Sequence, residues 1–311
     1  MVRSLLLVPA LLSVVLTAAA GEDEAVRIQH PFLWEFQHDG LDVTSYLFGT
    51  IHVNDPKITQ LDPQVLAAFK VSDCAWFEID FLKDAAAQVK SISLPSGQHL
   101  EDLVPGETVT RIDQRLNALS PLLSRTVLPE FRVVAWPLVL ANLEAQMSHP
   151  GVQPLDMQLQ LLARESKMKT GGLEDATSQL KPLVELTIEK QIEFLNASLD
   201  VMDEDTKQGI SQLEILVNLY AIGDGDALQK YLENELRRPQ VSEELKKLFV
   251  DTLLIERNVD MVKAIAANVE ASPGEVHFVA VGIAHLLGKG SVVDGLKQAG
   301  YTVRRVDVGT P

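Results

Sequence analysis

Apolar positions follow a strand pattern near both ends of the chain and a helical pattern between them. Close to the start, the β-rich runs FLWEF and VTSYLFGTIH (43–52) flank an Asp-Gly pair, which predicts two strands joined by a hairpin turn. Residues 58–73 then have helical spacing, and residues 74–80 form a short apolar run that ends in acidic residues. A strand, a helix and a second strand in so few residues indicate a βαβ unit with parallel strands.

The middle of the chain, residues 82–272, has a helical pattern almost throughout. Its amphipathic segments are separated by proline and glycine, which favour helix ends. The exception is SKMKTGGLE (166–174), where a helix could end and a short strand begin. We therefore expect this region to be mainly helical.

The strand pattern returns near the end of the chain. Residues 275–287 form a β-branched run, residues 291–300 have the pattern of a short helix, and residues 301–308 form a closing strand, which together make a second βαβ unit. The expected fold class is α/β, with two βαβ halves that form a mixed, largely parallel sheet and a large helical insertion between them. A single domain over residues 21–311 would divide into an α/β core, 31–81 and 273–308, and the mainly helical insertion, 82–272.

Residues 1–20 have the layout of a secretory signal peptide. Arg3 precedes an apolar segment from Leu5 to Leu16, and Ala18-Ala19-Ala20 offers a cleavage site. The apolar segment is shorter than the roughly 20 residues that a membrane-spanning helix needs. We expect export to the periplasm or the extracellular space, with no membrane span after cleavage; an uncleaved anchor is the alternative.

Charge and cysteine content narrow the classes of partner. The formal net charge is −16, which repels phosphate backbones, so nucleic acid is not an expected partner. The chain has one cysteine, Cys74, which lies in an apolar run and is expected to be a buried strand residue. A peptide or a small molecule remains as the class of substrate.

Two distant strands end in the same Gly-x-x-His motif. His52 follows YLFGTI and His285 follows FVAVGIA, so both imidazoles fall at the carboxyl ends of predicted strands, where ligands bind in open parallel sheets. Glu78, at the end of residues 74–80, supplies a carboxylate there, with Asp80 as an alternative. Two histidines and a carboxylate can hold a divalent metal ion such as Mn, Co or Zn while leaving room for water.

Several further segments, taken together with these motifs, resemble a known family. The runs LDPQVLAAFKVSDCAWFEID, QHLEDLVPGETVTRID, PLDMQLQLLARESKMKTGGLED and LLIERN, with the two histidine motifs, make the chain similar to the TraB/GumN family, to which the Tiki metalloproteases are related. The resemblance covers about residues 31–307. It implies a hydrolase-like site formed by His52, Glu78, Arg257 and His285.

The resemblance also points to two further acidic residues. Asp156 and Glu174 fall at positions that the family pattern favours and could support the ligands of the site, Asp156 by lining the site or by holding a histidine. Asp156 could instead be a helix N-terminal charge and Glu174 a loop acid. Arg257 could stabilise negative charge on a substrate oxygen, or orient Glu78.

The function expected from these features is an exported, metal-dependent hydrolase, with a peptidase favoured. His52, Glu78 and His285 would hold the ion, with Glu78 as ligand or general base and Arg257 as a catalytic residue. The alternative is a non-catalytic envelope protein that binds a small molecule, haem or a partner protein at the same place.

Overall fold

The computed structural model describes residues 28–38 and 40–306, which form a mixed six-stranded sheet with helices on both faces and a helical lobe beyond the sheet. The expected signal peptide lies outside the described residues. The order of the strands is β4-β3-β5-β2-β1-β6. Their bounds are β1 Leu33–His38, β2 Ser45–Thr50, β3 Cys74–Phe77, β4 Lys169–Gly172, β5 His277–Gly282 and β6 Tyr301–Arg305.

The four strands from β4 to β2 are parallel, whereas β1 is antiparallel to both β2 and β6. The expected α/β class and mixed, largely parallel sheet are therefore confirmed. The two βαβ units interleave, because β5 of the second unit lies between β2 and β3 of the first. The apolar sequence of β5, HFVAVG, suits this central position between two neighbours.

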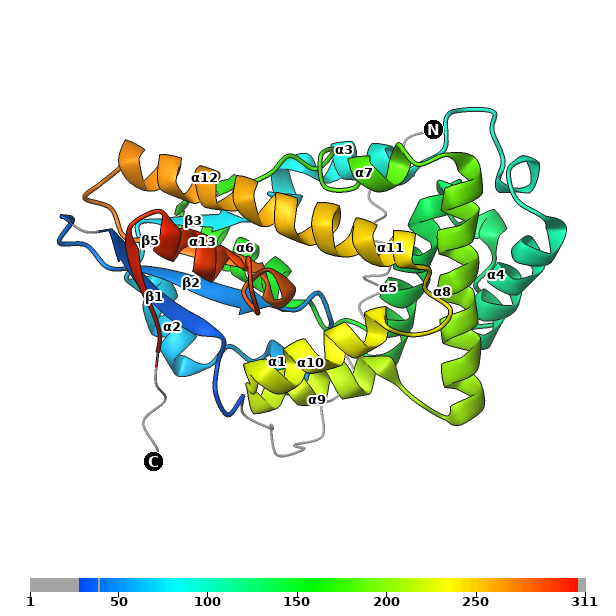
Figure 1. Cartoon of the computed structure of the whole chain (residues 1–311), viewed down its shortest axis with the longest axis horizontal. Helices are drawn as coiled ribbons and strands as arrows, with labels where there is room; N and C mark the ends of the chain where they lie inside the picture. The colour runs from blue at the N-terminus through cyan, green and yellow to red at the C-terminus, as the bar shows by residue number, and fades with distance from the viewer. Residues whose placement is uncertain (1–27, 39, 307–311) are drawn as a thin grey trace.

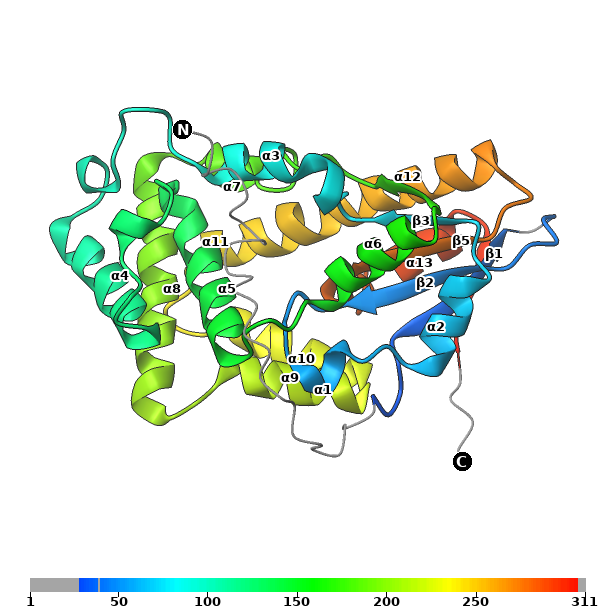
Figure 2. The same ribbon diagram turned by 180° about the vertical axis from the view of Figure 1, so that it is seen from behind.

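Helices cover both faces of the sheet. Figure 1 shows α12 and α13 on one face, and Figure 2 shows α2 and α6 on the other. The bounds of these four helices are α2 Pro63–Lys70, α6 Leu155–Glu165, α12 Arg257–Ala271 and α13 Val292–Gln298. Because both faces are covered, the strands can be apolar on both sides.

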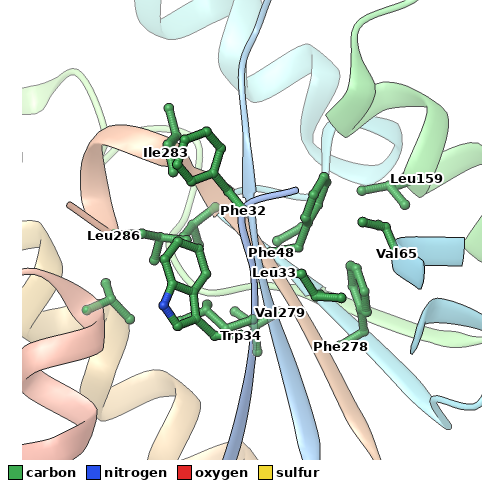
Figure 3. Packing of buried hydrophobic residues seen from close by; sticks show 14 of the residues in the cluster. Phe32, Leu33, Trp34, Phe48, Val65, Leu159, Phe278, Val279, Ile283 and Leu286 are labelled. Atoms are coloured by element: carbon green, nitrogen blue, oxygen red, sulfur yellow. The ribbon is translucent and has the colours of Figure 1, made fainter. Parts of the chain in front are cut away.

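The core of the sheet is apolar on each face. In Figure 3, Phe32 and Leu286 lie on one side of the strands, while Phe48, Val65 and Leu159 lie on the other. All five are at most 3% exposed. Burial of this size fixes the register of the strands, because a one-residue shift would turn every buried side chain to the opposite face.

The helical insertion forms a lobe beyond the carboxyl ends of the strands, toward which the arrowhead of β2 points (Figure 1). Helices α4, α5 and α8 pack around a second apolar cluster that includes Ile112, Leu140 and Leu195. Residues 82–272 also return to the sheet, because α6 and β4 belong to this part of the chain. The remaining helices are α1 Pro56–Thr59, α3 Phe81–Ile92, α4 Gly106–Leu119, α5 Trp136–Ser148, α7 Lys181–Val184, α8 Ile188–Gln208, α9 Gln212–Ile222, α10 Gly225–Leu236 and α11 Glu243–Lys247.

One long helical stretch connects the lobe to the sheet. It begins as α11, continues as the π-helical segment η4 (Leu248–Glu256) and becomes α12 at Arg257 (Figure 1). Long π-helical segments are rare and often occur at functional sites, because they change which side chains face a given direction. Among the described residues, no helix combines the length and apolarity needed to cross a bilayer.

Candidate metal centre

The two Gly-x-x-His motifs converge because their strands are neighbours. Strands β2 and β5 pair in parallel, with Thr50 opposite Gly282. His52 follows two residues after Thr50, and His285 ends the single 3₁₀ turn (η5, Ile283–His285) that follows Gly282. Both imidazoles therefore leave the sheet at the same end, toward the helical lobe.

Glu78 lies between the two imidazoles. It follows β3, which pairs with the other side of β5. Its Oε1 atom is 3.9 Å from His52 Nε2 and 4.0 Å from His285 Nε2. The side chains of Glu78 and His285 are each 7% exposed, whereas that of His52 is 50% exposed. One carboxylate oxygen thus faces both ring nitrogens, and His52 forms the solvent side of the group.

Gly282 leaves space at the centre of this group. A Cβ atom at this position would lie 2.9 Å from Glu78 Oε1, 3.7 Å from His52 Nε2 and 3.8 Å from His285 Cδ2. The Gly282 N–H also donates a hydrogen bond to Glu78 Oε1. Gly49 differs, because a Cβ there would meet the apolar side chain of Ile283 at 2.6 Å. Gly282 therefore keeps the centre of the group open, whereas Gly49 permits close packing of apolar side chains.

Each imidazole has a polar partner at Nδ1. His52 Nδ1 lies 3.2 Å from Asp156 Oδ1, in the first turn of α6, and His285 Nδ1 lies 2.6 Å from Asn258 Oδ1 in α12. Asp156 was expected near the site, whereas Asn258 was not. The available sequence signal for Asn258 was its place directly after Arg257 in IERN. With both Nδ1 atoms engaged, both Nε2 atoms face Glu78.

Arg257 holds the other side of Glu78. Its Nη2 donates to Glu78 Oε2 at 3.0 Å, and its Nε donates to both oxygens of Glu174 at 3.1 and 3.0 Å. Nη1 donates to the carbonyl of Leu253 in η4. Gln179, which the sequence reasoning missed, also donates to Glu78 Oε2 at 3.1 Å. Glu174 therefore contacts the arginine, and the arginine orients Glu78.

Charge and burial shift the pKa values of these groups in different directions. Burial would raise the pKa of Glu78, but the imidazoles of His285 and His52, the guanidinium of Arg257 and the Gly282 N–H outweigh it and lower this pKa to about 2. The charge of Asp156 raises the pKa of His52 to about 9, although burial opposes it. Burial lowers the pKa of His285 to about 4, against the charge of Glu78.

Asp80, the alternative carboxylate, has a structural role. Its Oδ1 accepts a hydrogen bond from the backbone N–H of Lys83 and caps α3. Its Oδ2 accepts from the Thr170 hydroxyl at 3.3 Å. Glu78 is therefore the carboxylate that the strand end presents to the imidazoles.

The donor set of His52, Glu78 and His285 fits a divalent ion. Two ligands that are each about 2.1 Å from one ion lie up to about 4.2 Å apart, and the separations of 3.9 and 4.0 Å fall within that limit. Imidazole nitrogens anchored through their second nitrogen are the usual arrangement around protein-bound metals. The residues present thus have the chemistry of such a site, and Glu78 lies within reach of each imidazole. The three ligand atoms do not all lie within 4.8 Å of one another, so the imidazoles would have to move closer together around an ion.

A second group with metal-ligand chemistry lies at the amino ends of β3 and β5. Cys74, Glu275 and His277 have ligand atoms within 4.8 Å of one another. However, the indole N–H of Trp76 donates to His277 Nδ1 at 2.9 Å, which occupies the lone pair that a metal would need. Burial also raises the pKa of Cys74 to about 11, so its thiol stays protonated. This group is less suited to a metal than the one at the strand ends.

Comparisons with known proteins agree with the sequence motifs. A family model described as the TraB/PrgY/gumN family matches residues 32–305. The chain is 28% identical to Metalloprotease TIKI1 of Danio rerio over 94% of this chain and 67% of that protein. It is 27% identical to Metalloprotease TIKI2 of Xenopus tropicalis over 94% of this chain and 63% of that protein. The corresponding values for Metalloprotease TIKI1 of Homo sapiens are 26%, 90% and 63%.

The chain spans about two thirds of the length of these relatives. No solved structure matches it. The family model covers nearly the whole described part, and the resemblance expected from the sequence is confirmed: the chain belongs to the TraB/PrgY/gumN family.

Proposed function

We propose that this protein is a metal-dependent hydrolase that cleaves peptide bonds, with His52, Glu78 and His285 as the ligands of a divalent ion. The observation that supports the proposal most directly is the position of Glu78 Oε1 within 4.0 Å of both Nε2 atoms. The relatives are named as metalloproteases, which supports the same reaction class. Mn, Co and Zn are the candidate ions.

The ion would lower the pKa of a bound water and polarise the scissile carbonyl. The protein's own residues provide the rigid frame around it. Asn258 holds the imidazole of His285 through a hydrogen bond at Nδ1, and the carboxylate of Asp156 faces Nδ1 of His52 at 3.2 Å. Arg257, through its contact with Glu78 Oε2, leaves Oε1 as the oxygen that faces the imidazoles. Fixed ligands of this kind reduce the reorganisation needed when substrate binds.

The electrostatics favour Glu78 as a ligand over Glu78 as general base. A base works best when its pKa lies near the operating pH, whereas the pKa of Glu78 is lowered to about 2. Its two oxygens also accept three hydrogen bonds, from Gly282, Arg257 and Gln179. A carboxylate held in this way stays charged and fixed in place, which suits coordination. The role of Arg257 is accordingly to hold Glu78.

The test compares metal content and turnover in the same preparations. Purified protein from residue 21 onward is assayed for bound metal by mass spectrometry and for cleavage of a peptide library with added Zn, Mn or Co. We expect His52→Ala, His285→Ala and Glu78→Gln each to lose metal and cleavage together. His99→Ala is the matched control, because His99 is an exposed histidine whose ring contacts Glu130.

The outcome also separates the enzyme from the binding protein. Metal-dependent cleavage that the three variants abolish supports the hydrolase. Stoichiometric binding of a small molecule, haem or a partner protein, without turnover under any metal, would overturn it in favour of the non-catalytic alternative.

We also propose that the protein is exported, with the signal peptide removed after Ala20, and that it acts in the periplasm or outside the cell. The layout of residues 1–20 supports this proposal. Mass measurement of the mature N-terminus after expression with the native leader tests it. A mature protein that begins at Met1 would contradict it.

A further inference from the structure

Asn258 occupies a position that determines which nitrogen of His285 carries the hydrogen. It is the second residue of α12 and is 2% exposed. Its Nδ2 donates to the carbonyl of Gly290 at 2.9 Å, and its Oδ1 lies 2.6 Å from His285 Nδ1. Both contacts link α12 to the segment that follows β5.

The orientation of the Asn258 amide follows from its second contact. The carbonyl of Gly290 can only accept a hydrogen bond, so the NH₂ group of Asn258 must face it. The amide oxygen then faces His285, and that oxygen can only accept. His285 must therefore carry its hydrogen on Nδ1 and donate it to Asn258. Its Nε2 is left with a free lone pair on the side of Glu78.

Without Asn258, the opposite arrangement would be favoured. Glu78 Oε1 is 4.0 Å from His285 Nε2, and a buried carboxylate attracts a nearby N–H group. A hydrogen on Nε2 would point toward Glu78 and occupy the nitrogen that a metal ion requires. The short contact at Nδ1 opposes this arrangement, because a buried Asn258 oxygen without a donor would be costly.

The partner of the other imidazole differs in charge. His52 faces the carboxylate of Asp156, whereas His285 faces the neutral amide of Asn258. A carboxylate at Nδ1 would stabilise the charged imidazolium, which carries a hydrogen on both nitrogens. An amide oxygen accepts the hydrogen on Nδ1 but does not favour a second hydrogen on Nε2. The amide thus suits a buried ring that must stay neutral, with one nitrogen open.

We propose that Asn258 is a positioning residue that holds His285 in the Nδ1–H form, so that Nε2 faces Glu78 with a free lone pair. The contact itself joins two residues of this chain and needs no ion. Its purpose as a ligand-orienting device rests on the proposed function of the site.

The first test uses metal-free wild-type protein labelled with ¹⁵N-histidine. Long-range ¹H–¹⁵N spectra distinguish the two neutral forms of an imidazole, and the His285→Gln variant assigns the signals of His285. We expect the Nδ1–H form near pH 7. The Nε2–H form in wild-type protein would overturn the proposal, whatever any variant does.

The second test measures Zn²⁺ affinity by competition with a chromophoric chelator. Removal of a residue that orients a metal ligand costs about 10–100-fold in affinity, so we expect a loss of that size in Asn258→Ala together with a shift toward the Nε2–H form. Asn258→Asp keeps an acceptor oxygen, so Nδ1 should keep its hydrogen, and its added charge should raise the fraction of doubly protonated rings; an Nε2–H ring in this variant would contradict the proposal. Met261→Ala, in the same helix and fully buried, controls for a general loss of stability.

The two tests separate the inference from the proposed function. An Nδ1–H ring in a wild-type protein that binds no Zn²⁺, Mn²⁺ or Co²⁺ would support the positioning of His285 and overturn the metal site. Unchanged Zn²⁺ affinity in a folded Asn258→Ala variant would overturn the positioning role and leave the metal site standing. If Asn258→Ala does not fold, the wild-type spectrum and the Asn258→Asp variant still decide.

Discussion

Replacement of Gly282 by alanine adds one methyl group at the centre of the three candidate ligands. The backbone of Gly282 has φ −55° and ψ 137°, which any residue can adopt, so the change introduces no backbone strain. The new Cβ would instead lie 2.9 Å from Glu78 Oε1. The effect of Gly282→Ala is therefore one of contact alone.

The size of the effect follows from that contact. A carbon atom packs comfortably at about 3.5 Å, so Glu78 must retreat by roughly 0.5 Å. The carboxylate cannot move freely, because Gly282, Arg257 and Gln179 all donate to it. Overpacking of this kind costs about 1–3 kcal/mol of folding free energy. A ligand displaced by about 0.5 Å no longer meets the tolerance of a metal site, and we expect at least a tenfold loss of Zn²⁺ affinity, about 1.4 kcal/mol.

Urea unfolding of the metal-free protein measures the first quantity, and chelator competition measures the second. Gly274→Ala is the neutral control, because a Cβ there meets nothing within 4 Å. Gly171→Ala is the destabilising control, because its Cβ would lie 2.6 Å from the ring of Trp76, outside the site. We expect Gly171→Ala to lose stability with its affinity intact. A Gly282→Ala protein that binds Zn²⁺ like wild type would refute the assignment of this space to a metal.

Four further predictions concern charge and burial. The folded-state pKa values of His285 and Glu78 lie below their unfolded values, so the contribution of each residue to folding stability is present at neutral pH and is lost on acidification. The loss runs from about pH 6.5 down to 4 for His285 and from about pH 4.5 down to 2 for Glu78. The free energy of unfolding of the metal-free protein, measured with urea, should fall over this range, by up to about 3 kcal/mol for His285, and His285→Gln should remove the upper part of the fall. Arg257→Lys should weaken Zn²⁺ binding about tenfold or more, because lysine cannot bridge two carboxylates with a fixed planar group; wild-type affinity would contradict this orienting role. Because the pKa of His52 is raised to about 9, metal binding near pH 7.5 should release about one proton, seen as a dependence of calorimetric heats on buffer ionisation; heats that do not depend on the buffer would contradict it. The thiol of Cys74 is fully buried and should react with a thiol reagent only after unfolding, so rapid reaction in native protein would show that β3 opens.

The sequence was sufficient to predict the α/β class and the end of the sheet where polar side chains gather. Two parallel strands that each end in Gly-x-x-His must place both histidines at one edge, whatever the order of the strands. The order itself was not predictable. The chain connects β2 to β3 through α2, and nothing in that segment indicates that β5, some 200 residues later, separates them.

The contacts that hold the site were harder to foresee, because they come from the helical insertion and from α12. Gln179 lies in an irregular segment before α7, where periodicity gives no direction for its side chain. Asn258, which contacts His285, follows nine residues that wind as a π-helix, and such a segment shifts the helical phase from that of an α-helix. Glu174 was expected only as a possible supporting residue; it contacts Arg257, and it follows β4, which lies one strand further from β5 than β3 does. Periodicity predicts which face of a helix is buried, but not such a change of phase.

The charges around the imidazoles explain why a divalent ion suits this place. Glu78, Glu174 and Asp156 are each largely buried, and against them the same group holds one fixed positive charge, that of Arg257. With both imidazoles neutral and all three carboxylates ionised, the group carries a charge of about −2, which is expensive at low dielectric unless a cation compensates it. In the metal-free protein, the proton on His52 supplies part of that compensation, which is why the pKa of this half-exposed ring rises although burial opposes it. A divalent cation at the Nε2 atoms would replace that proton and balance the remaining charge. The protonation of His52 without metal and the binding of a cation thus both compensate the same excess of negative charge.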